Sequence, residues 1–376
     1  MRAIVRKAVI AITALHGLVH LMGVTRESLP WLWLLAGVAM ITTAVLMVAA
    51  PRTWWRLGAV AVVVSQVAIV TSWDEAWAGT IANVIIGVAV AHAFATEGPW
   101  GLRRRSRRAM AAVHPAPVGP DVTDADVDQL PAPLALYLRR AGAVGQPRPV
   151  GFRATIAGRI RGGADAPWMP FTGEQVNTFG PRWTRAFFID ATMHGMPADV
   201  FHLYDDGTAT MDVRGAGVLP IVHASGPELD RAETATVFND LCVLAPAALL
   251  DAPVQWESVD DRTVRGTFRL GAETVTAELR FDDDGDLVDF VTDDRLRASA
   301  DGRTFTRQRW STPLYDARWF GRRRLPARGE ALWHAPPPEA TFSYLEFEVV
   351  GIADLGTPDA DSSASPASPA GAARAA

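Results

Sequence analysis

The clearest pattern in the chain is a set of four apolar stretches within the first hundred residues. Each contains about 16 to 20 residues, and a helix of that length spans about 24–30 Å, close to the thickness of the hydrocarbon core of a bilayer. Later parts of the chain contain nothing similar. We therefore predict four transmembrane helices, at Ala8–Val24, Trp31–Ala50, Leu57–Trp73 and Thr80–Ala95.

Charged residues at the ends of these stretches favour one orientation. Basic residues precede the first stretch, occupy the loop between the second and third, and follow the fourth as a cluster of five arginines between 103 and 108. The other two loops carry Arg26 with Glu27, and Asp74 with Glu75. Positive charge marks the cytoplasmic side of a membrane protein. The pattern predicts a multi-pass protein of the cell (cytoplasmic) membrane with both termini in the cytoplasm.

The pattern beyond residue 150 is that of a sheet. Apolar residues alternate with polar ones, as at Val275, Ala277 and Leu279, and this period of two is typical of half-buried strands. A helical region at 226–250 lies between the strand runs, and Pro246 predicts a break in it. We predict a soluble α+β domain in which a curved antiparallel β-sheet wraps helices.

The boundaries of four parts follow from these patterns. We predict a transmembrane region at 1–100, a basic juxtamembrane segment and linker at 101–129, the α+β domain at 130–355 and a disordered tail at 356–376. The net charge of the whole chain is −5, yet its first 112 residues hold 11 basic and 4 acidic residues, so the remainder is acidic. An acidic domain argues against nucleic acid as a partner. The single cysteine, Cys242, excludes an intramolecular disulfide.

Two sets of residues resemble a known family. The first is the segment His16–Gly23 with Ser72–Asp74, and the second is Pro167–Thr172 with Pro326–Trp333. Together they resemble an uncharacterised family of bacterial membrane proteins, known as a domain of unknown function, whose N-terminal four-helix region is similar to the DoxX type. The α+β domain is more weakly similar to the lipoprotein-carrier (LolA-like) fold. That resemblance implies a curved sheet around an apolar cavity and implies no reaction.

Polar residues within the predicted membrane region form one candidate site. His16 and His20 share one helix face, and Gln66, Asp74 and Asn83 lie on or beside the third and fourth stretches. Polar groups are costly in a membrane unless they find partners inside a bundle. One interpretation is a metal or quinone site with Asp74 as the orienting carboxylate. The other is a hydrogen-bonded network that fixes helix packing, and whether a metal binds is not determined by two histidines.

A second candidate site lies at the start of the sheet. Trp168, Met169 and Phe171 would form the lip of an apolar pocket, because aromatic and Met side chains suit adaptable apolar surfaces. Glu174 would lie near that lip as an acid or base. The alternative is an ordinary core turn followed by a solvated carboxylate on a strand.

The function predicted from these features is binding without turnover. The α+β domain would bind a lipid or another hydrophobic small molecule in a concave pocket, with membrane lipid as the further partner. No catalytic residue, cofactor, protein partner or nucleic-acid partner is predicted. The alternative is a membrane redox or metal-handling protein that uses His16 and His20. A third hypothesis is a structural or interaction module whose soluble domain docks a partner.

Overall fold

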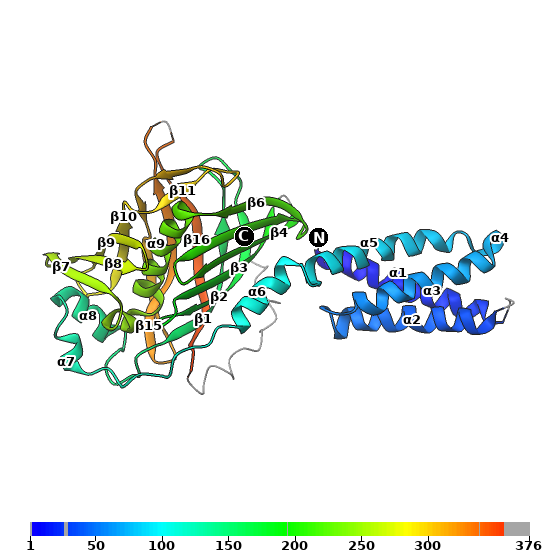
Figure 1. Cartoon of the computed structure of the whole chain (residues 1–376), viewed down its shortest axis with the longest axis horizontal. Coiled ribbons are helices and arrows are strands. Elements are labelled where there is room, and N and C mark those ends of the chain that lie inside the picture. The colour runs from blue at the N-terminus through cyan, green and yellow to red at the C-terminus, as the bar shows by residue number, and fades with distance from the viewer. Residues whose placement is uncertain (1, 26–28, 194, 338, 357–376) are drawn as a thin grey trace. The chain divides into compact units, whose positions relative to one another are not determined.

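The computed structural model describes residues 2–25, 29–193, 195–337 and 339–356. The chain divides into two compact units (Figure 1). The first comprises residues 1–108 with the segments 192–199 and 214–220, and the second comprises 109–191, 200–213 and 221–376. The loop residues Arg26 and Glu27 and, apart from Gly356, the predicted tail lie outside the described residues.

Helices form the first hundred residues, as the apolar stretches predict. Their bounds are α1 Arg2–Gly23, α2 Pro30–Ala49, α3 Trp55–Thr71, α4 Trp73–Ala76 and α5 Gly79–Glu97, and the basic helix α6 follows at Leu102–Ala111. Among the described residues, three helical segments are long and apolar enough to cross a membrane: Ile4–Gly23, Pro30–Ala49 and Gly79–Ala111. The predicted count of four is not confirmed, because α3 has 17 residues and falls short of that length.

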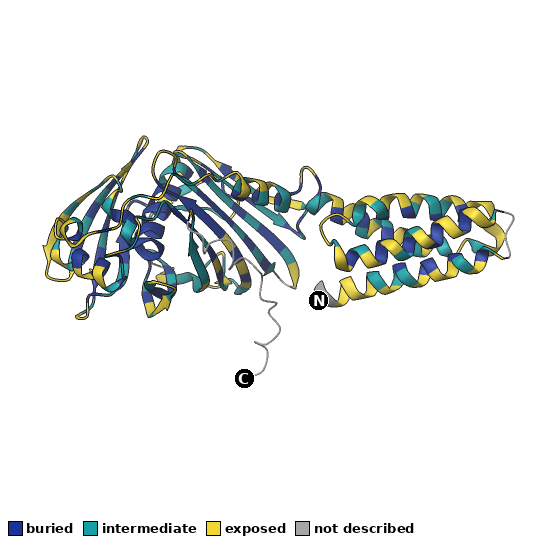
Figure 2. Ribbon diagram, turned by 90° about the horizontal axis from the view of Figure 1, so that it is seen from below, coloured by how far each residue is buried: buried dark blue, intermediate teal, exposed yellow. Residues whose placement is uncertain are grey.

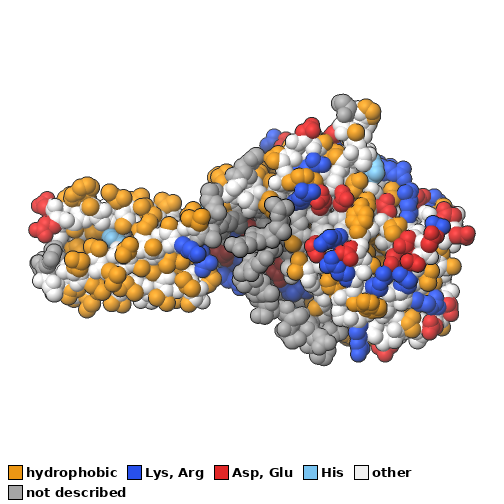
Figure 3. Space-filling view, turned by 180° about the vertical axis from the view of Figure 1, so that it is seen from behind, with side chains coloured by type: hydrophobic (Ala, Val, Ile, Leu, Met, Phe, Trp, Pro, Cys, Tyr) orange, Lys and Arg blue, Asp and Glu red, His pale blue; other side chains and the backbone are white. Residues whose placement is uncertain are grey.

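The surface of the helical region is apolar and its interior holds polar groups. On α1, Leu15 and Leu18 are 62% and 53% exposed, whereas His16 and His20 are 7% and 1% exposed. Hydrophobic side chains cover this region in the space-filling view, while charges of both signs cover the sheet domain (Figure 3). A bundle in water would have the opposite arrangement, since contiguous exposed apolar surface is rare on soluble proteins. The distribution matches helices whose outer faces contact lipid.

Glycines allow close approach between α1 and α2. A Cβ atom on Gly17 would lie 3.1 Å from the carbonyl oxygen of Gly37, and one on Gly37 would lie 3.0 Å from that of Gly17. A Cβ atom on Gly23 would overlap the ring of Trp33, at 2.4 Å. Small residues at such contacts are typical of helix pairs in membranes, where close backbone packing replaces the hydrophobic effect.

An antiparallel sheet dominates the second part of the chain. The described residues contain a 14-stranded sheet in the order β6-β5-β4-β3-β2-β1-β16-β15-β13-β10-β9-β8-β7, with β14 paired to β15, and it does not close into a barrel. The strands are β1 Gly151–Ile160, β2 Met169–Thr178, β3 Thr184–Met193, β4 Met196–Asp205, β5 Thr208–Gly215, β6 Leu219–Ser225, β7 Val254–Asp260, β8 Thr263–Leu270, β9 Glu273–Phe281, β10 Leu287–Thr292, β13 Trp310–Ser311, β14 Leu314–Phe320, β15 Arg323–His334 and β16 Thr341–Asp354; β11 Leu296–Ala298 and β12 Phe305–Arg307 form a separate pair.

Helix α9, Pro227–Leu244, lies inside the curve of this sheet (Figure 1). It begins after Gly226, whose φ of 113° suits a residue without a side chain, and Pro227 fits the first helical turn. From Ala232 to Leu244 every residue is buried, and strands alternate buried and exposed positions around it (Figure 2). A helix buried on all sides needs a surrounding layer, and the sheet provides it.

Shorter helices and an aromatic cluster complete the domain. Phe238 of α9 stacks on Phe268 at 5.0 Å between ring centroids and meets Phe290 edge to face at 5.4 Å. These rings tie α9 to β8 and β10 and form the core on that side. The break predicted at Pro246 is confirmed, since α9 ends at Leu244 and a 3₁₀ helix follows. The remaining helices are α7 Asp124–Val127, α8 Ala132–Arg140 and the 3₁₀ helix η1 Pro246–Leu250.

Candidate ligand-binding site

Alternation along β2 separates a face directed at α9 from an outer face. Phe171, Gly173 and Gln175 are buried, whereas Thr172 and Glu174 between them are exposed. Successive side chains of a strand point to opposite sides of the sheet, so the buried set forms part of its inner face. This face and α9 together can enclose a site.

A partly open cavity of about 140 Å³ lies between α9 and the inner face of the sheet. Strands β1 to β4, β15 and β16 supply one wall, and α9 supplies the other. The apolar lining includes Ile156, Ile160, Phe171, Ile189, Leu345 and Phe347. The polar lining includes Gln175, Arg185, His202, Glu233, Asp240 and Arg295.

The inner face of the sheet changes from apolar to polar along the strands. Phe171 of β2 lies opposite Gly158 of β1, which lies opposite Phe347 of β16. Farther along β2, Asn177 lies opposite Arg185 of β3. Phe171 and Asn177 are about 20 Å apart along the strand, at about 3.3 Å per residue. The cavity wall is therefore apolar toward Phe171 and polar toward Arg185.

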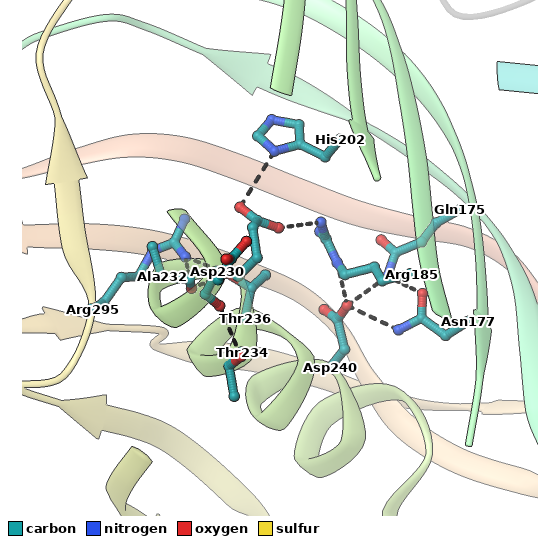
Figure 4. A network of polar contacts seen from close by, with 11 residues as sticks. Gln175, Asn177, Arg185, His202, Asp230, Ala232, Thr234, Thr236, Asp240 and Arg295 are labelled. Atoms are coloured by element: carbon teal, nitrogen blue, oxygen red, sulfur yellow. Dashed lines mark hydrogen bonds and ion pairs between the residues drawn. The ribbon is translucent and has the colours of Figure 1, made fainter. Parts of the chain in front are cut away.

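A buried ion network forms the polar part of the wall (Figure 4). Arg185 donates from Nη1 to Glu233 Oε2 at 3.0 Å and from Nε to Asp240 Oδ2 at 2.7 Å. The same Asp240 oxygen accepts from Gln175 Nε2 at 2.7 Å and from Asn177 Nδ2 at 3.0 Å. Glu233 and Asp240 are two helical turns apart, so both project from one face of α9. The network thus joins β2, β3 and α9.

The charges of this network support one another. Burial by itself raises the pKa of Glu233, but His202 and Arg185 facing this carboxyl hold its pKa well below the ordinary value. Burial likewise lowers the pKa of Arg185, and the nearby Asp240 and Glu233 more than reverse the effect. His202 Nδ1 lies 3.3 Å from Glu233 Oε1 without the alignment of a hydrogen bond. The Glu233 carboxylate is therefore ionised, and Arg185 lies against both carboxylates within the wall.

Arg295, directly before β11, borders the cavity in a different way. Its Nη1 donates to the carbonyl oxygen of Ala232 at 2.7 Å and to the hydroxyl of Thr236. Its guanidinium lies 4.8 Å from the ring centroid of Trp310 and 5.8 Å from that of Trp333. Its Nε is buried and has no hydrogen-bond partner among the described residues. Neutral groups and aromatic faces therefore hold this cation in position.

The predicted lip residues do not all reach this cavity. Phe171 lines it, but Glu174 lies on the outer face of β2, where it is exposed and pairs with Arg153. The two residues are three positions apart, and an odd spacing places side chains on opposite faces of a strand. Gln175, which shares the parity of Phe171, takes the inward position that the sequence interpretation gave to Glu174.

Trp168 and Met169 also lie outside the cavity lining. Both are half-buried at the start of β2. The Trp168 ring packs against the guanidinium groups of Arg159 and Arg161, whose central carbons lie 4.6 and 4.4 Å from its centroid. Cation–π contacts of this kind explain an aromatic side chain at the sheet surface without a ligand.

The structure brings together most of the predicted intramembrane residues. His16 Nε2 lies 3.1 Å from both Ser65 Oγ and Asn83 Oδ1, and His20 Nε2 lies 2.7 Å from the same Ser65 oxygen. Ser65 Oγ donates to Asn83 Oδ1 at 2.9 Å. The amide oxygen only accepts, so His16 donates to it from Nε2. These contacts link α1, α3 and α5 through hydrogen bonds between side chains.

Gln66 extends this network and Asp74 does not join it. Asn83 Nδ2 donates to Gln66 Oε1 at 3.0 Å, and Gln66 Nε2 donates to Thr80 at 3.1 Å. Asp74 is exposed on α4, and within the described part of the chain it makes no hydrogen bond to either histidine. Nowhere in the described ranges do three or more His, Cys, Asp or Glu side chains form a group that could hold a metal ion.

Sequence reasoning missed the charged residues of the cavity wall. Glu233 and Asp240 are seven residues apart in a predicted helix, and Arg185 directly precedes an apolar strand run, Ala186 to Ile189. A carboxylate pair on one helix face, in a helix that the sheet must bury, was the available signal. Ser65, within the run Val62–Val67, was the corresponding signal in the helical region.

Comparison with known proteins gives one family and three distantly similar solved structures. The model of a family of unknown function (DUF6544) matches residues 120–347. These residues begin after the helical region, so the similarity of that region to the DoxX type stays a prediction. No curated protein matches the chain.

Several solved structures are distantly similar to it. A DUF1329 family protein from Desulfovibrio piger is 12% identical, with a TM-score of 0.35 over 64% of this chain and 97% of that one. A putative outer membrane lipoprotein-sorting protein domain from Vibrio parahaemolyticus is 8% identical, with a TM-score of 0.34 over 61% and 93%. A LolA superfamily protein from Nitrosomonas europaea is 13% identical, with a TM-score of 0.30 over 63% and 96%.

Proposed function

The chain belongs to the family of unknown function DUF6544, and from the cavity inside its sheet domain we propose that it binds a hydrophobic small molecule. The observation that supports this proposal is the partly open cavity between α9 and the sheet. Apolar side chains from several strands line most of it, and a few polar groups converge on one part. Small-molecule sites commonly combine these two features.

The size of the cavity limits what part of a ligand enters it. Its volume of about 140 Å³ is similar to that of an engineered cavity of about 150 Å³ that binds benzene, and it is below the range of about 300–1,000 Å³ for drug-sized sites. We therefore propose that one short alkyl segment or one ring is buried beside Phe171 and Phe347. A complete two-chain lipid does not fit this volume.

The same proposal includes a membrane location. The apolar outer faces of α1, α2 and α5 support an integral membrane protein, and the distribution of arginines supports cytoplasmic termini. A reporter enzyme fused to the C-terminus of the full chain tests the orientation. We expect activity from a reporter that works in the cytoplasm, and activity from one that works in the periplasm would overturn it.

Photolabelling of the full-length protein in detergent tests ligand binding at the cavity. The probe is octanol carrying a diazirine on its alkyl chain, and labelled peptides are mapped by tandem mass spectrometry. We expect labels on inner-face residues of β1, β2 or β16, because carbene insertion marks the groups nearest to the bound chain. Labelling confined to residues 1–100 would contradict binding in the sheet domain.

A pair of matched variants shows whether the cavity itself binds the probe. Ala331→Leu adds apolar volume to a lining position, whereas Thr172→Leu adds a leucine on the outer face of β2. We expect Ala331→Leu to reduce labelling of the inner face severalfold and Thr172→Leu to leave it unchanged. Equal labelling in both variants would show that the probe binds elsewhere.

A further inference from the structure

The two arginines of the cavity wall differ in how their charge is compensated. Arg185 contacts the carboxylates of both Glu233 and Asp240. Arg295 contacts a carbonyl oxygen, a hydroxyl and two aromatic rings, and the described residues provide no carboxylate within ion-pair distance of it. Arg295 is half-buried, and the Glu233 carboxylate acts on it only from beyond ion-pair distance. A ligand anion can therefore form an ion pair with Arg295.

The hydrogen bonds of Arg295 use only one of the three nitrogens of its guanidinium. Nη1 makes both hydrogen bonds to α9, and Nε makes none. Among the described residues its second terminal nitrogen, Nη2, likewise has no hydrogen-bond partner. An N–H group of Nη2 can donate a charge-assisted hydrogen bond to a carboxylate oxygen of a ligand in the cavity that Arg295 lines. Because Trp310 and α9 already fix the side chain, little further ordering is needed on binding.

The surrounding charges favour an anion over a cation. Glu233 already faces Arg185 and His202, and Asp240 already accepts from Arg185 and two amides. A ligand amine would therefore compete with the donors that already contact these carboxylates. A ligand carboxylate could instead accept a hydrogen bond from Nη2 of Arg295. A phosphate monoester carries about two charges near neutral pH, more than one guanidinium compensates.

We propose that the ligand is an acidic amphiphile, a short apolar chain or ring with one carboxylate, and that Arg295 binds the carboxylate. This inference rests on the proposed function, since it concerns the same cavity. The apolar segment lies toward Phe171, and the acid group lies at the polar part of the wall. Arg295 is a specificity-determining residue in this arrangement, because it distinguishes ligands of equal apolar size by their head group.

Competition among three ligands of equal chain length tests the inference. Octanoate, octanol and octylamine each compete with the diazirine probe for labelling of the inner face in the full-length protein. We expect octanoate to compete at a concentration lower than that of octanol by on the order of tenfold, as a charge-assisted hydrogen bond provides. Octylamine should compete no better than octanol.

Variants of Arg295 show which group creates the preference. Arg295→Gln should remove the advantage of octanoate over octanol, and Arg295→Lys should retain part of it because a point charge remains without the planar fork. Arg297→Gln is the matched control, since Arg297 lies two residues away and pairs with Glu339 at the surface. If Arg295→Gln does not fold, the inference is still tested by the ratio of the octanoate and octanol concentrations that compete, measured in the wild-type protein and in Arg295→Lys.

The outcomes separate this inference from the proposed function. Equal competition by octanoate and octanol in the wild-type protein, or a preference for octylamine, would overturn the acidic head group and leave a hydrophobic site intact. A preference for octanoate that persists in Arg295→Gln would show that another group binds the acid. Failure of all three to compete would instead contradict the proposed function itself.

Discussion

The helical region and the sheet domain both bury polar groups, but they stabilise them by different means. Around α9 the buried groups are ions, and Arg185 bridges two carboxylates while amides complete the contacts. Among α1, α3 and α5 no carboxylate or arginine joins the network, and histidine, serine and amide side chains of the described residues share hydrogen bonds. The surroundings differ accordingly, since the outer faces of the helices are apolar and the sheet domain carries charges on its surface (Figure 3).

This difference has a physical cause. An ion pair in an interior is stable only when each charge has a partner and further hydrogen bonds satisfy the remaining atoms. In a bilayer the cost of charge is higher still, and neutral groups that exchange hydrogen bonds avoid it. Loss of one member should therefore be costly around α9, where it leaves a buried charge, and modest in the helical region, where it leaves a neutral group.

The largest expected effect is at Arg185. Arg185→Met removes the cation between Glu233 and Asp240 and leaves two buried carboxylates without it. We expect a loss of about 3–5 kcal/mol in the free energy of unfolding, the usual cost of an uncompensated buried charge. Chemical denaturation of the full-length protein in detergent, followed by near-UV circular dichroism of the sheet-domain aromatics, measures it.

Arg182 provides the matched control for this substitution. Its pair with Asp205 is at the surface, with side-chain exposures of 69% and 37%. Arg182→Met should change the free energy of unfolding by about 0–1 kcal/mol, because solvent screens exposed pairs. If the two variants lose equal stability, the buried network around α9 contributes no more to the free energy of unfolding than an exposed ion pair does.

A smaller effect is expected at Asn83 in the helical region. Asn83→Leu removes contacts to His16, Ser65 and Gln66 while keeping a side chain of similar size. Hydrogen bonds between membrane helices contribute about 0.6 kcal/mol on average and at most about 1.7 kcal/mol. We expect a loss of about 1–2 kcal/mol in a titration of the helical region with denaturing detergent.

Thr43 provides a control that loses a buried hydrogen bond outside the network. It is buried on α2 and donates to the carbonyl of Ala39 in its own helix. Thr43→Val should therefore cost less than Asn83→Leu. A loss at Asn83 as large as that at Arg185 would break the comparison, since it would mean that the helical network behaves like a buried ion.

The fold was largely accessible from sequence because its signals are local. Apolar stretches marked the helices, alternation marked the strands, and Pro246 marked the end of α9, each within a short window. The bounds of the third helix were the exception, since α3 runs from Trp55 to Thr71, two residues earlier at each end than the predicted stretch Leu57–Trp73. Its boundaries depend on how its neighbours pack and not on composition alone.

The site was less accessible because its partners are far apart in the chain. Arg185 meets Glu233 across 48 positions and Asp240 across 55, and the pairing depends on how the sheet curves around α9. Glu174 was placed at the pocket although Gln175 occupies the inner face, because the register of β2 was not visible in the sequence. His16 and His20 were identified, since an apolar helix makes polar residues conspicuous.

The smallest expected effect on stability is at Asp289 on β10. It compares two carboxylates of the sheet domain, Asp289 and Asp240. Burial raises the pKa of this carboxyl to about 6, although Arg280 acts against the rise, and its Oδ1 has no hydrogen-bond partner among the described residues. Below pH of about 4 the carboxyl is neutral in the folded and the unfolded chain, so its ionisation has no effect on stability. Between about 4 and 6 the unfolded chain ionises first, and stability falls as the pH rises.

Asp289→Asn removes this ionisation and keeps an oxygen acceptor. Relative to wild type, it should raise the free energy of unfolding by on the order of 1 kcal/mol above pH of about 6, after allowance for solvent screening, and the gain should fade toward pH of about 4. Thermal unfolding of the two proteins between pH 4 and 8 measures the difference. A gain that is constant with pH would show that Asp289 is already compensated as Asp240 is, and burial alone would then not distinguish the two carboxylates.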